Sequence, residues 1–361
     1  MSQQRVNIMM TCVNSQVAPS IIQLIYEHPD YEVHVVGCDA SPAEEILGQS
    51  FCESCYSVPP GMDDTYIQAI LNIVEKHHIQ LIFPGSDEEC LTLSRYREEL
   101  QSRGCDVACS AYEKIALASN KYRMIMKLKE AGIRSSEAYV PQTLEDIEKI
   151  AKRLGYPERE VVIKPQFGRG SKGFKVITSQ YDRYEAFCRE KHFRISLEEL
   201  KTLFAGHEED LPNYLMMEMY PGDKYSADIL VSHGKVISIV IRNNGPLPKI
   251  NPPTQIATIV FDQDVRTYAE SIVKLMGFDY FVQIEIGRDI EGGLGFIEIN
   301  TRIDATLPIT TGLGLNFFRE MITYAITGQM RSDIPDYRDF SKQLRFRRYW
   351  QHLFEELSSA S

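Results

Sequence analysis

The sequence predicts two kinds of fold in succession, a Rossmann-like α/β domain and then a larger α+β domain. Three observations support this prediction. The first hundred residues alternate short apolar runs with amphipathic stretches, whereas the segment after residue 155 groups its apolar runs together. The length of 361 residues fits two or three compact modules. A content of 43% hydrophobic and 25% charged residues is ordinary for a globular protein.

The elements of the α/β part follow from hydrophobic periodicity. Strands are expected at 6–10, 33–37 and 81–83, and amphipathic helices at 18–28 and 65–77. This order is typical of a βαβαβ unit with a parallel sheet. The turn at 11–17 contains no glycine, so a pyrophosphate could not approach its backbone as it does in a dinucleotide-binding turn. We therefore predict a Rossmann-like shape without a dinucleotide.

The middle of the chain is predicted to be helical. Residues 111–132 form one helical stretch that opens near Ser119–Asn120 and closes at Gly132, a residue typical of a helix end. A short linker, 133–141, leads to a charged amphipathic helix at 142–154. A glycine, a tyrosine and a proline end that helix.

A strand-rich unit follows this helix. A charged helical stretch is expected up to about residue 209 and a second helix at 264–276. Strands are expected at 161–165, 174–178, 214–218, 225–231, 235–242, 281–286 and 295–300. Because strands and helices occur in groups here, this part is predicted to be an α+β domain.

Charge and hydropathy exclude several classes of function. The formal net charge of −11 argues against a broad nucleic-acid or anionic-membrane surface, although a local basic pocket for a phosphorylated ligand is compatible with it. No apolar run approaches the length that crosses a bilayer, and the N-terminus lacks a secretion signal, so a cytoplasmic location is expected. The eight cysteines are expected to be reduced, structural thiols.

A glycine-rich string connects two of the predicted strands. Gly168, Gly170 and Gly173 match G-x-G-x-x-G, and the apolar, β-branched run after them predicts a hairpin rather than a dinucleotide-binding helix. Glycines let backbone N–H groups close over phosphate oxygens, and Ser171 adds a donor. Lys164 lies upstream on the entering strand. The string therefore predicts a cradle for a triphosphate, with a flexible surface hairpin as the alternative.

A second constellation carries oxygen donors near the end of the strand-rich unit. Glu298 and Asn300 alternate along one strand and so share a face, and Glu285 lies on the strand before it. Two carboxylates and an amide oxygen suit Mg²⁺. Arg302 follows, where it could neutralise a transferring phosphoryl group. Solvated carboxylates on an edge strand are the alternative.

The order of these motifs resembles that of the ATP-grasp superfamily. Asn120–Lys121, Lys164, the glycine hairpin, Glu218, Arg242, Glu285 and the string from Glu298 to Arg302 occur in the expected succession. Over residues 5–320 the chain is most similar to the carbamoyl-phosphate-synthetase-like carboxylate–amine ligases. The segments 83–89 and 119–122 resemble the preATP-grasp part of that family.

The resemblance implies a division of the chain and a set of site residues. A Rossmann-like preATP-grasp domain would cover 1–115, a two-lobed ATP-grasp domain 116–330 with its lid at about 135–220, and a C-terminal extension 331–361. ATP would contact Lys121, Lys164, Gly168, Gly170, Ser171, Gly173, Glu218, Met219, Tyr220 and Asp223. Metal ions would bind Glu285, Glu298 and Asn300. Arg302 and Arg242 would act on the transferring phosphoryl group.

Two departures from the family pattern bear on the ligands. Many relatives have an acidic residue that binds the ribose hydroxyls where this chain has Lys224, so Asp223 is expected to substitute for it. Relatives often carry a small-residue or glycine-rich turn after the arginine, whereas this chain has Ile303 to Thr306. That segment would border the acceptor site, so the substrates are left open.

The resemblance also implies a reaction and its partners. The expected enzyme uses ATP and Mg²⁺, with Mn²⁺ possible, to activate a small carboxylate as an acyl phosphate and join it to an amine. The expected partners are these small molecules rather than nucleic acid or membrane, and a homodimer is possible. The alternatives are a non-catalytic ATP- or metabolite-binding protein, or an acyl kinase that stops at the acyl phosphate.

Overall fold

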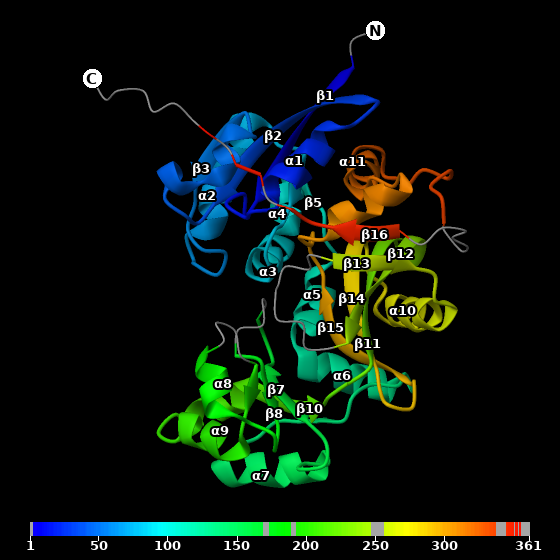
Figure 1. Ribbon diagram of the computed structural model, residues 1–361. Helices are drawn as coiled ribbons and strands as arrows, with labels where there is room; N and C mark the ends of the chain where they lie inside the picture. The colour runs from blue at the N-terminus through cyan, green and yellow to red at the C-terminus, as the bar shows by residue number, and fades with distance from the viewer. Residues whose placement is uncertain are drawn as a thin grey trace.

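The protein is built around three β-sheets. The computed structural model describes residues 3–168, 173–188, 193–246, 256–336, 344–349, 351–352 and 354. A parallel sheet lies at one end, a small sheet at the other, and a six-stranded sheet between them (Figure 1). Among these described residues, no helix is both long and apolar enough to cross a lipid bilayer.

The N-terminal sheet has the strand order β3-β2-β1-β4-β5, and all its pairs are parallel. Its strands are β1 (Gln4–Thr11), β2 (Tyr31–Asp39), β3 (Ser54–Ser57), β4 (Leu81–Phe83) and β5 (Asp106–Val107). Its helices are α1 (Ala18–Tyr26), α2 (Tyr66–His77), α3 (Asp87–Arg95) and α4 (Arg97–Ser102). The predicted parallel βαβαβ unit is confirmed, and β3 and β5 extend it at both edges.

The small sheet has the order β6-β10-β7-β8-β9. It consists of β6 (Ala138–Tyr139), β7 (Val161–Pro165), β8 (Lys175–Ile177), β9 (Arg194–Ile195) and β10 (Tyr214–Glu218), with α7 (Leu144–Arg153), α8 (Arg183–Cys188) and α9 (Leu197–Phe204). Thr143 and Asp146 cap the start of α7 reciprocally, which satisfies two backbone donors there. We call this unit the lid sheet.

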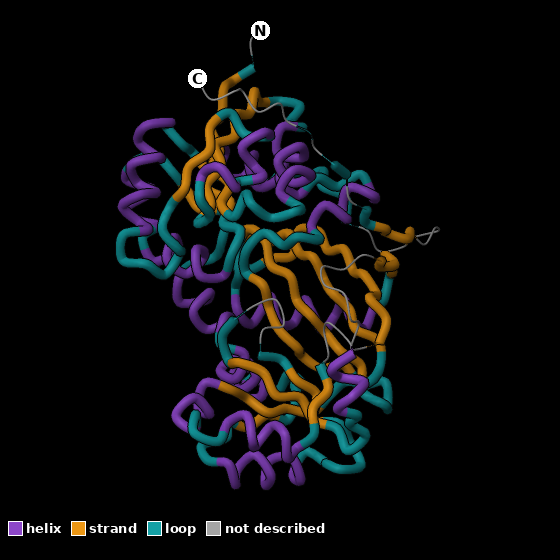
Figure 2. The backbone as a smooth tube through the Cα atoms, turned by 60° about the vertical axis from the view of Figure 1, so that its left-hand side comes forward, coloured by secondary structure: helices purple, strands orange, loops and turns teal. Residues whose placement is uncertain are grey.

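The six-stranded sheet has the order β15-β14-β11-β12-β13-β16, and every pair is antiparallel. Its strands are β11 (Asp223–Ser232), β12 (Lys235–Pro246), β13 (Ile256–Val260), β14 (Tyr280–Arg288), β15 (Leu294–Asn300) and β16 (Leu344–Arg347), and its helices are α10 (Gln263–Met276) and α11 (Phe317–Thr327). We call it the central sheet. Figure 2 shows it between the other two units.

Two helices connect the N-terminal sheet to the lid sheet. α5 (Tyr112–Ser119) and α6 (Lys121–Glu130) lie end to end in the sequence. The single helical stretch predicted over 111–132 is wrong in this respect, because Asn120 leaves the helical conformation and caps α6 with its side chain. Its Oδ1 accepts the backbone N–H of Arg123 at 2.8 Å.

Several short elements depart from the sequence prediction for one physical reason. The helix expected up to residue 209 is interrupted by β9, where Ile195 is buried in the lid core. The expected linker 133–141 contains β6, which pairs with Met216 and Met217. The sequence analysis also missed β13, β16 and α11. Strands of two to five residues carry too little periodicity to be recognised, and tertiary pairing stabilises them. This reason does not apply to α11, which has 11 residues.

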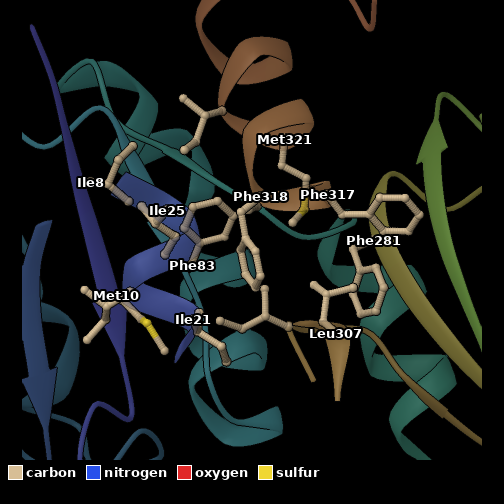
Figure 3. Packing of buried hydrophobic residues seen from close by; sticks show 14 of the residues in the cluster. Ile8, Met10, Ile21, Ile25, Phe83, Phe281, Leu307, Phe317, Phe318 and Met321 are labelled. Carbon is tan, nitrogen blue, oxygen red and sulfur yellow. The ribbon is translucent and has the colours of Figure 1, made fainter. Parts of the chain in front are cut away.

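A single apolar cluster joins the N-terminal sheet to the central sheet. Ile8, Met10, Ile21, Ile25 and Phe83 come from the N-terminal unit and point toward α11 and β14 (Figure 3). Phe318 on α11 meets Phe83 edge-to-face, with ring centroids 5.7 Å apart. This contact fixes the position of the N-terminal unit against the central sheet.

The first prediction concerns this apolar cluster. Phe318→Ala should lower the free energy of unfolding by about 3–5 kcal/mol, because the ring is buried and the cavity can close only in part. Urea unfolding followed by circular dichroism measures the change. Phe187→Ala on α8, where the side chain is 87% exposed, is the matched control and should change stability little. Equal effects of the two substitutions would contradict the role of Phe318.

Candidate active site

One face of the central sheet gathers polar and charged side chains. Glu285 lies directly opposite Glu298, and Gln283 directly opposite Asn300. On the next strand, Ser226 is opposite Glu285 and Asp228 is opposite Gln283. Paired and alternate residues share a face. We call this set the polar face; its members are Lys224, Ser226, Asp228, Arg242, Gln283, Glu285, Glu298 and Asn300.

The opposite face of the same strands is apolar. Tyr225, Ala227 and Ile229 alternate with the polar residues of β11 and join a core with α6 and α10. Ile284 and Ile299 do the same on β14 and β15. The strands are therefore held by a hydrophobic layer on one side, which leaves the side chains on the other side free to form a site.

Two lysines from outside the central sheet reach the polar face. Lys164, on β7 of the lid sheet, is 5% exposed, and its Nζ donates to the carbonyl of Ile297 at 3.0 Å. Lys121 begins α6, and its Nζ lies 4.0 Å from a carboxylate oxygen of Glu298. The same Nζ donates to the carbonyl of Gly168 at 2.8 Å. β7 of the lid sheet and the start of α6 thus bring two ammonium groups to the carboxylate of Glu298 on the central sheet.

The protonation of Lys164 and Glu298 reflects this crowding. Burial lowers the pKa of Lys164 to about 8, although the Glu298 carboxylate favours its charged form. Burial opposes ionisation of Glu298, but the surrounding cations outweigh it and leave its pKa below the usual value. Those cations are Lys121, Lys164, Lys224 and Arg302. The carboxylate is therefore ionised at neutral pH.

Lys224 forms an ion pair with Glu285 on the polar face. The two side chains are 20% and 14% exposed, so both charges are largely withdrawn from water. Burial disfavours the charged form of Lys224, yet Glu285 and Glu298 together raise its pKa. Burial raises the pKa of Glu285, and Lys224 offsets part of that effect.

Two arginines complete the charge network. Arg242 Nη1 contacts a carboxylate oxygen of Asp228 at 2.5 Å, and both side chains are buried. Arg302 Nη1 lies 3.2 Å from Asp304. Its Nε lies 3.3 Å from Asp87 at the start of α3. The N-terminal unit thus contributes a carboxylate to the edge of the site, and Asp304 lies between the two arginines, 3.8 Å from Arg242.

The expected metal-binding residues share the polar face, with different surroundings. Glu298 is 31% exposed, whereas Glu285 is occupied by Lys224. Asn300 donates through Nδ2 to Gln283 at 2.9 Å, and its Oδ1 accepts from Arg302 at 3.3 Å. In the part of the chain that the structure describes, no three His, Cys, Asp or Glu side chains form a metal-binding group. Any ion here would therefore need the amide oxygen or ligands from a bound molecule.

The residues expected at the adenine lie at the end of β10 and directly after it, where the chain passes from the lid sheet to the central sheet. Glu218 Oε1 accepts from the Tyr220 hydroxyl at 3.0 Å and from the Glu137 backbone N–H at 3.3 Å. Ser136 Oγ lies 3.0 Å from both the Tyr220 hydroxyl and the carbonyl of Phe296 on β15. Met219 packs against the apolar core behind the polar face. These contacts tie the end of β10 to the strand that carries Glu298.

Asp223 and the glycine hairpin stand apart from this arrangement. The Asp223 carboxylate accepts from Asn243 Nδ2 at 2.7 Å, toward β12 rather than toward Glu218. Gly168 and Gly173 have φ values of 117° and 71°, which favour glycine. A Cβ at Gly173 would come within 2.9 Å of Pro165. Gly170 and Ser171 lie outside the described residues.

The sequence analysis missed four acidic or amide residues of the network: Asp87, Asp228, Gln283 and Asp304. One signal was available for Asp228. Lys224, Ser226 and Asp228 alternate with apolar residues along β11, which indicates a polar face on a strand that otherwise reads as buried. Asp87 and Asp304 offered no comparable periodic signal, because they approach the arginines from a helix start and a turn.

Family models match three successive parts of the chain. The model described as the PylC-like N-terminal domain matches residues 8–108. That of the carbamoyl-phosphate synthase L chain ATP-binding domain matches 119–204, and that of ATP-grasp in the biosynthetic pathway with Ter operon matches 210–348. The chain belongs to the ATP-grasp superfamily. The predicted resemblance and fold class are confirmed.

Individual relatives are distant. The 2-oxoglutarate carboxylase small subunit of Hydrogenobacter thermophilus is 24% identical over 297 residues, which are 79% of this ATP-grasp chain and 60% of that subunit. The chain therefore spans about 60% of the length of this relative. A carbamoyl phosphate synthase large chain of Clostridium acetobutylicum is 22% identical over 68% of this chain and 22% of its own length.

Solved structures share the ATP-grasp fold. The biotin carboxylase domain dimer of the Hydrogenobacter thermophilus 2-oxoglutarate carboxylase, in complex with MgADP, ADP and bicarbonate, matches with a TM-score of 0.67. It is 19% identical, over 90% of this chain and 70% of that one. The L-amino acid ligase of Bacillus licheniformis also has a TM-score of 0.67, with 16% identity over 90% and 75% of the two chains.

The second prediction follows from the buried lysine of the lid sheet. Between pH 8 and pH 10.5 the unfolded chain holds a proton on Lys164 that the folded chain has released. The stability of the natural protein relative to Lys164→Met should therefore rise with pH in this window, by up to about 1.4 kcal/mol per pH unit. Urea unfolding across the window measures the difference. It should stay constant for Lys149→Met, whose side chain is 75% exposed. A constant difference for Lys164→Met would contradict the lowered pKa.

Proposed function

We propose that the protein is an ATP-dependent ligase that activates a small carboxylate as an acyl phosphate and joins it to an amine. The observation that carries this proposal is the convergence of Lys121, Lys164 and Arg302 on Glu298, where three separate elements meet. This cluster supplies fixed cations and an ionised carboxylate at one edge of a buried sheet. Phosphoryl transfer requires mainly positioning and charge neutralisation, and these groups provide both.

The lysines would hold the phosphates of ATP. Lys164 is almost fully buried and has a lowered pKa, so a phosphate anion that binds beside it would favour its protonated form. Lys121 would lie on the neighbouring phosphate, because its Nζ also contacts the carbonyl at the entrance of the glycine hairpin. Glu218, Met219 and Tyr220 would contact the adenine. We retain Asp223 as a candidate for the ribose.

Glu298 and Asn300, with Glu285, would hold Mg²⁺ or Mn²⁺. Their oxygen atoms are of the hard type that these ions prefer. A metal ion bound there would neutralise charge on the phosphates of ATP. The side chains themselves orient the cluster: Asn300 is fixed by Gln283 and Arg302, and Glu298 faces both lysines.

The proposed reaction has two steps. A carboxylate oxygen attacks the γ-phosphorus of ATP, the bond from that phosphorus to the β–γ bridging oxygen breaks, and ADP leaves. The amine then attacks the acyl carbon and expels phosphate, with loss of one proton from the nitrogen. Arg302 would stabilise the charge that develops on the transferring group, and Arg242 would support it through the shared Asp304.

The substrates and the assembly belong to the proposal as well. The expected partners are a small carboxylate and an amine, in the cytoplasm. The biotin carboxylase domain that this chain resembles was solved as a dimer, and a homodimer is the assembly that we propose to test for this chain.

The third prediction tests the nucleotide site. Lys164→Ala should weaken ATP binding about 10- to 150-fold, because it removes a charge-assisted contact to phosphate worth about 1.5–3 kcal/mol in a closed cleft. Calorimetric titration with ATP and Mg²⁺ measures the dissociation constant. Lys149→Ala on the exposed side of α7 is the matched control and should bind as the natural protein does. An unchanged constant for Lys164→Ala would place the phosphates elsewhere.

The fourth prediction tests the reaction. With Mg-ATP, a competent carboxylate and hydroxylamine, a hydroxamate should accumulate, and oxygen-18 from the carboxylate should appear in released phosphate. Arg302→Ala should reduce both signals by about 10²- to 10³-fold, because it removes the cation beside the transferring group. Mass spectrometry detects both products. Amide formation without isotope transfer would exclude the acyl phosphate, and ADP release without any amine requirement would favour an acyl kinase.

A further inference from the structure

Lys224 occupies a distinctive place on the polar face. It lies on β11, opposite Gly245 on one neighbouring strand and Gly287 on the other. The space that a side chain at Gly287 would take is filled by Tyr220, whose Cβ would lie 2.6 Å from an added Cβ. Ser226 and Asp228, which follow Lys224 at alternate positions on the strand, direct their side chains to the same face. Lys224 therefore enters the candidate active site from the strand itself.

The partner of Lys224 is one of the three oxygen donors expected to bind metal. Its ammonium group is paired with the Glu285 carboxylate, and both side chains are largely shielded from water. Glu298 lies directly opposite Glu285 on the next strand and is about twice as exposed, at 31% against 14%. The two neighbouring carboxylates therefore differ in their surroundings. Glu285 is covered by the ammonium group of Lys224, whereas Glu298 is still partly accessible to water.

This inequality matters for divalent ions. Mg²⁺ binds at about 2.0–2.1 Å from each carboxylate oxygen and demands near-ideal octahedral geometry. An ion on Glu285 would have to displace the ammonium group or lie beside it, where two like charges repel in a poorly hydrated space. Glu298 also has cations around it, with the Lys121 Nζ 4.0 Å away and Lys224 among those that favour its ionised form, but its carboxylate is the more exposed of the two. Metal binding is therefore disfavoured at Glu285, which is paired with Lys224.

We propose that Lys224 is a resident cation that takes the place of a metal ion at Glu285, so that the site binds one divalent ion, on Glu298 and Asn300, together with the nucleotide. This inference rests on the proposed function and changes one part of its metal site, because Glu285 then binds the Lys224 ammonium group in place of an ion. In this arrangement the ammonium group of Lys224 neutralises Glu285 and faces the phosphates. Lys224 is then a binding residue for the phosphates, and Glu285 is a positioning residue that acts through Lys224.

Counting metal ions tests the inference without measuring activity. Equilibrium dialysis with ADP and Mn²⁺ gives the Mn²⁺ retained per ADP retained by the full chain, because the free Mn²⁺ and the Mn-ADP in solution are equal on both sides. The natural protein should retain about one Mn²⁺ per ADP, and Lys224→Met about two, since Glu285 then becomes free to bind an ion. Lys224→Arg and the exposed control Lys149→Met should both stay at about one.

A second pair of variants keeps the test independent of how well Lys224→Met folds. Glu285→Gln should still retain about one Mn²⁺ per ADP, whereas Glu298→Gln should lose most of it. Two Mn²⁺ per ADP in the natural protein, or loss of Mn²⁺ in Glu285→Gln, would overturn the inference and leave the proposed function standing. Absence of retained ADP in the natural protein would overturn the nucleotide site itself, and the inference with it.

Discussion

The charges on the polar face must balance one another, because water reaches few of them. A buried ion without a partner is costly, whereas a buried pair with good geometry can be tolerated. The face meets this constraint by pairing: Lys224 with Glu285, Arg242 with Asp228, and Arg302 with Asp304 and Asp87. Glu298 is shared by several cations instead of being matched by one. Two lysines, Lys121 and Lys164, thus act on this one carboxylate, and they are the charges that a polyphosphate could neutralise.

The balance depends on apolar packing elsewhere in the molecule. The central sheet can present charges on one face because its other face packs against α6 and α10. The cluster around Phe83 and Phe318 fixes the N-terminal unit against the same sheet (Figure 3), and this brings Asp87 to Arg302. The lid sheet contributes Lys164 through its contact with the carbonyl of Ile297. Three hydrophobic units are therefore needed to assemble one polar site.

The fold of this chain is shared with other ATP-grasp proteins, so the fold alone does not determine what the site does. The similar structures share the fold at low identity, so the fold is common to enzymes that act on different molecules. The chemistry of the site depends on the charged side chains that this frame carries. Lys224 is the clearest of them, because it faces a carboxylate of the site itself. Asp304 is another, since it lies between Arg242 and Arg302.

The sequence by itself determined the parallel βαβαβ unit, the long strands of the central sheet and the succession of motifs from Lys121 to Arg302. The strands and helices among these features show apolar residues every two or every three to four positions, and the motifs are short strings of neighbouring residues. Both kinds of signal can be recognised within a short stretch of sequence. Only the tertiary structure decided the short elements, such as β6, β9 and β16, and the partners of the charged residues. The pairings of Lys224 with Glu285 and of Arg302 with Asp87 depend on strand register and on the docking of separate units. No local pattern records such contacts, because their energy comes from groups that are far apart in the sequence and share a poorly hydrated space.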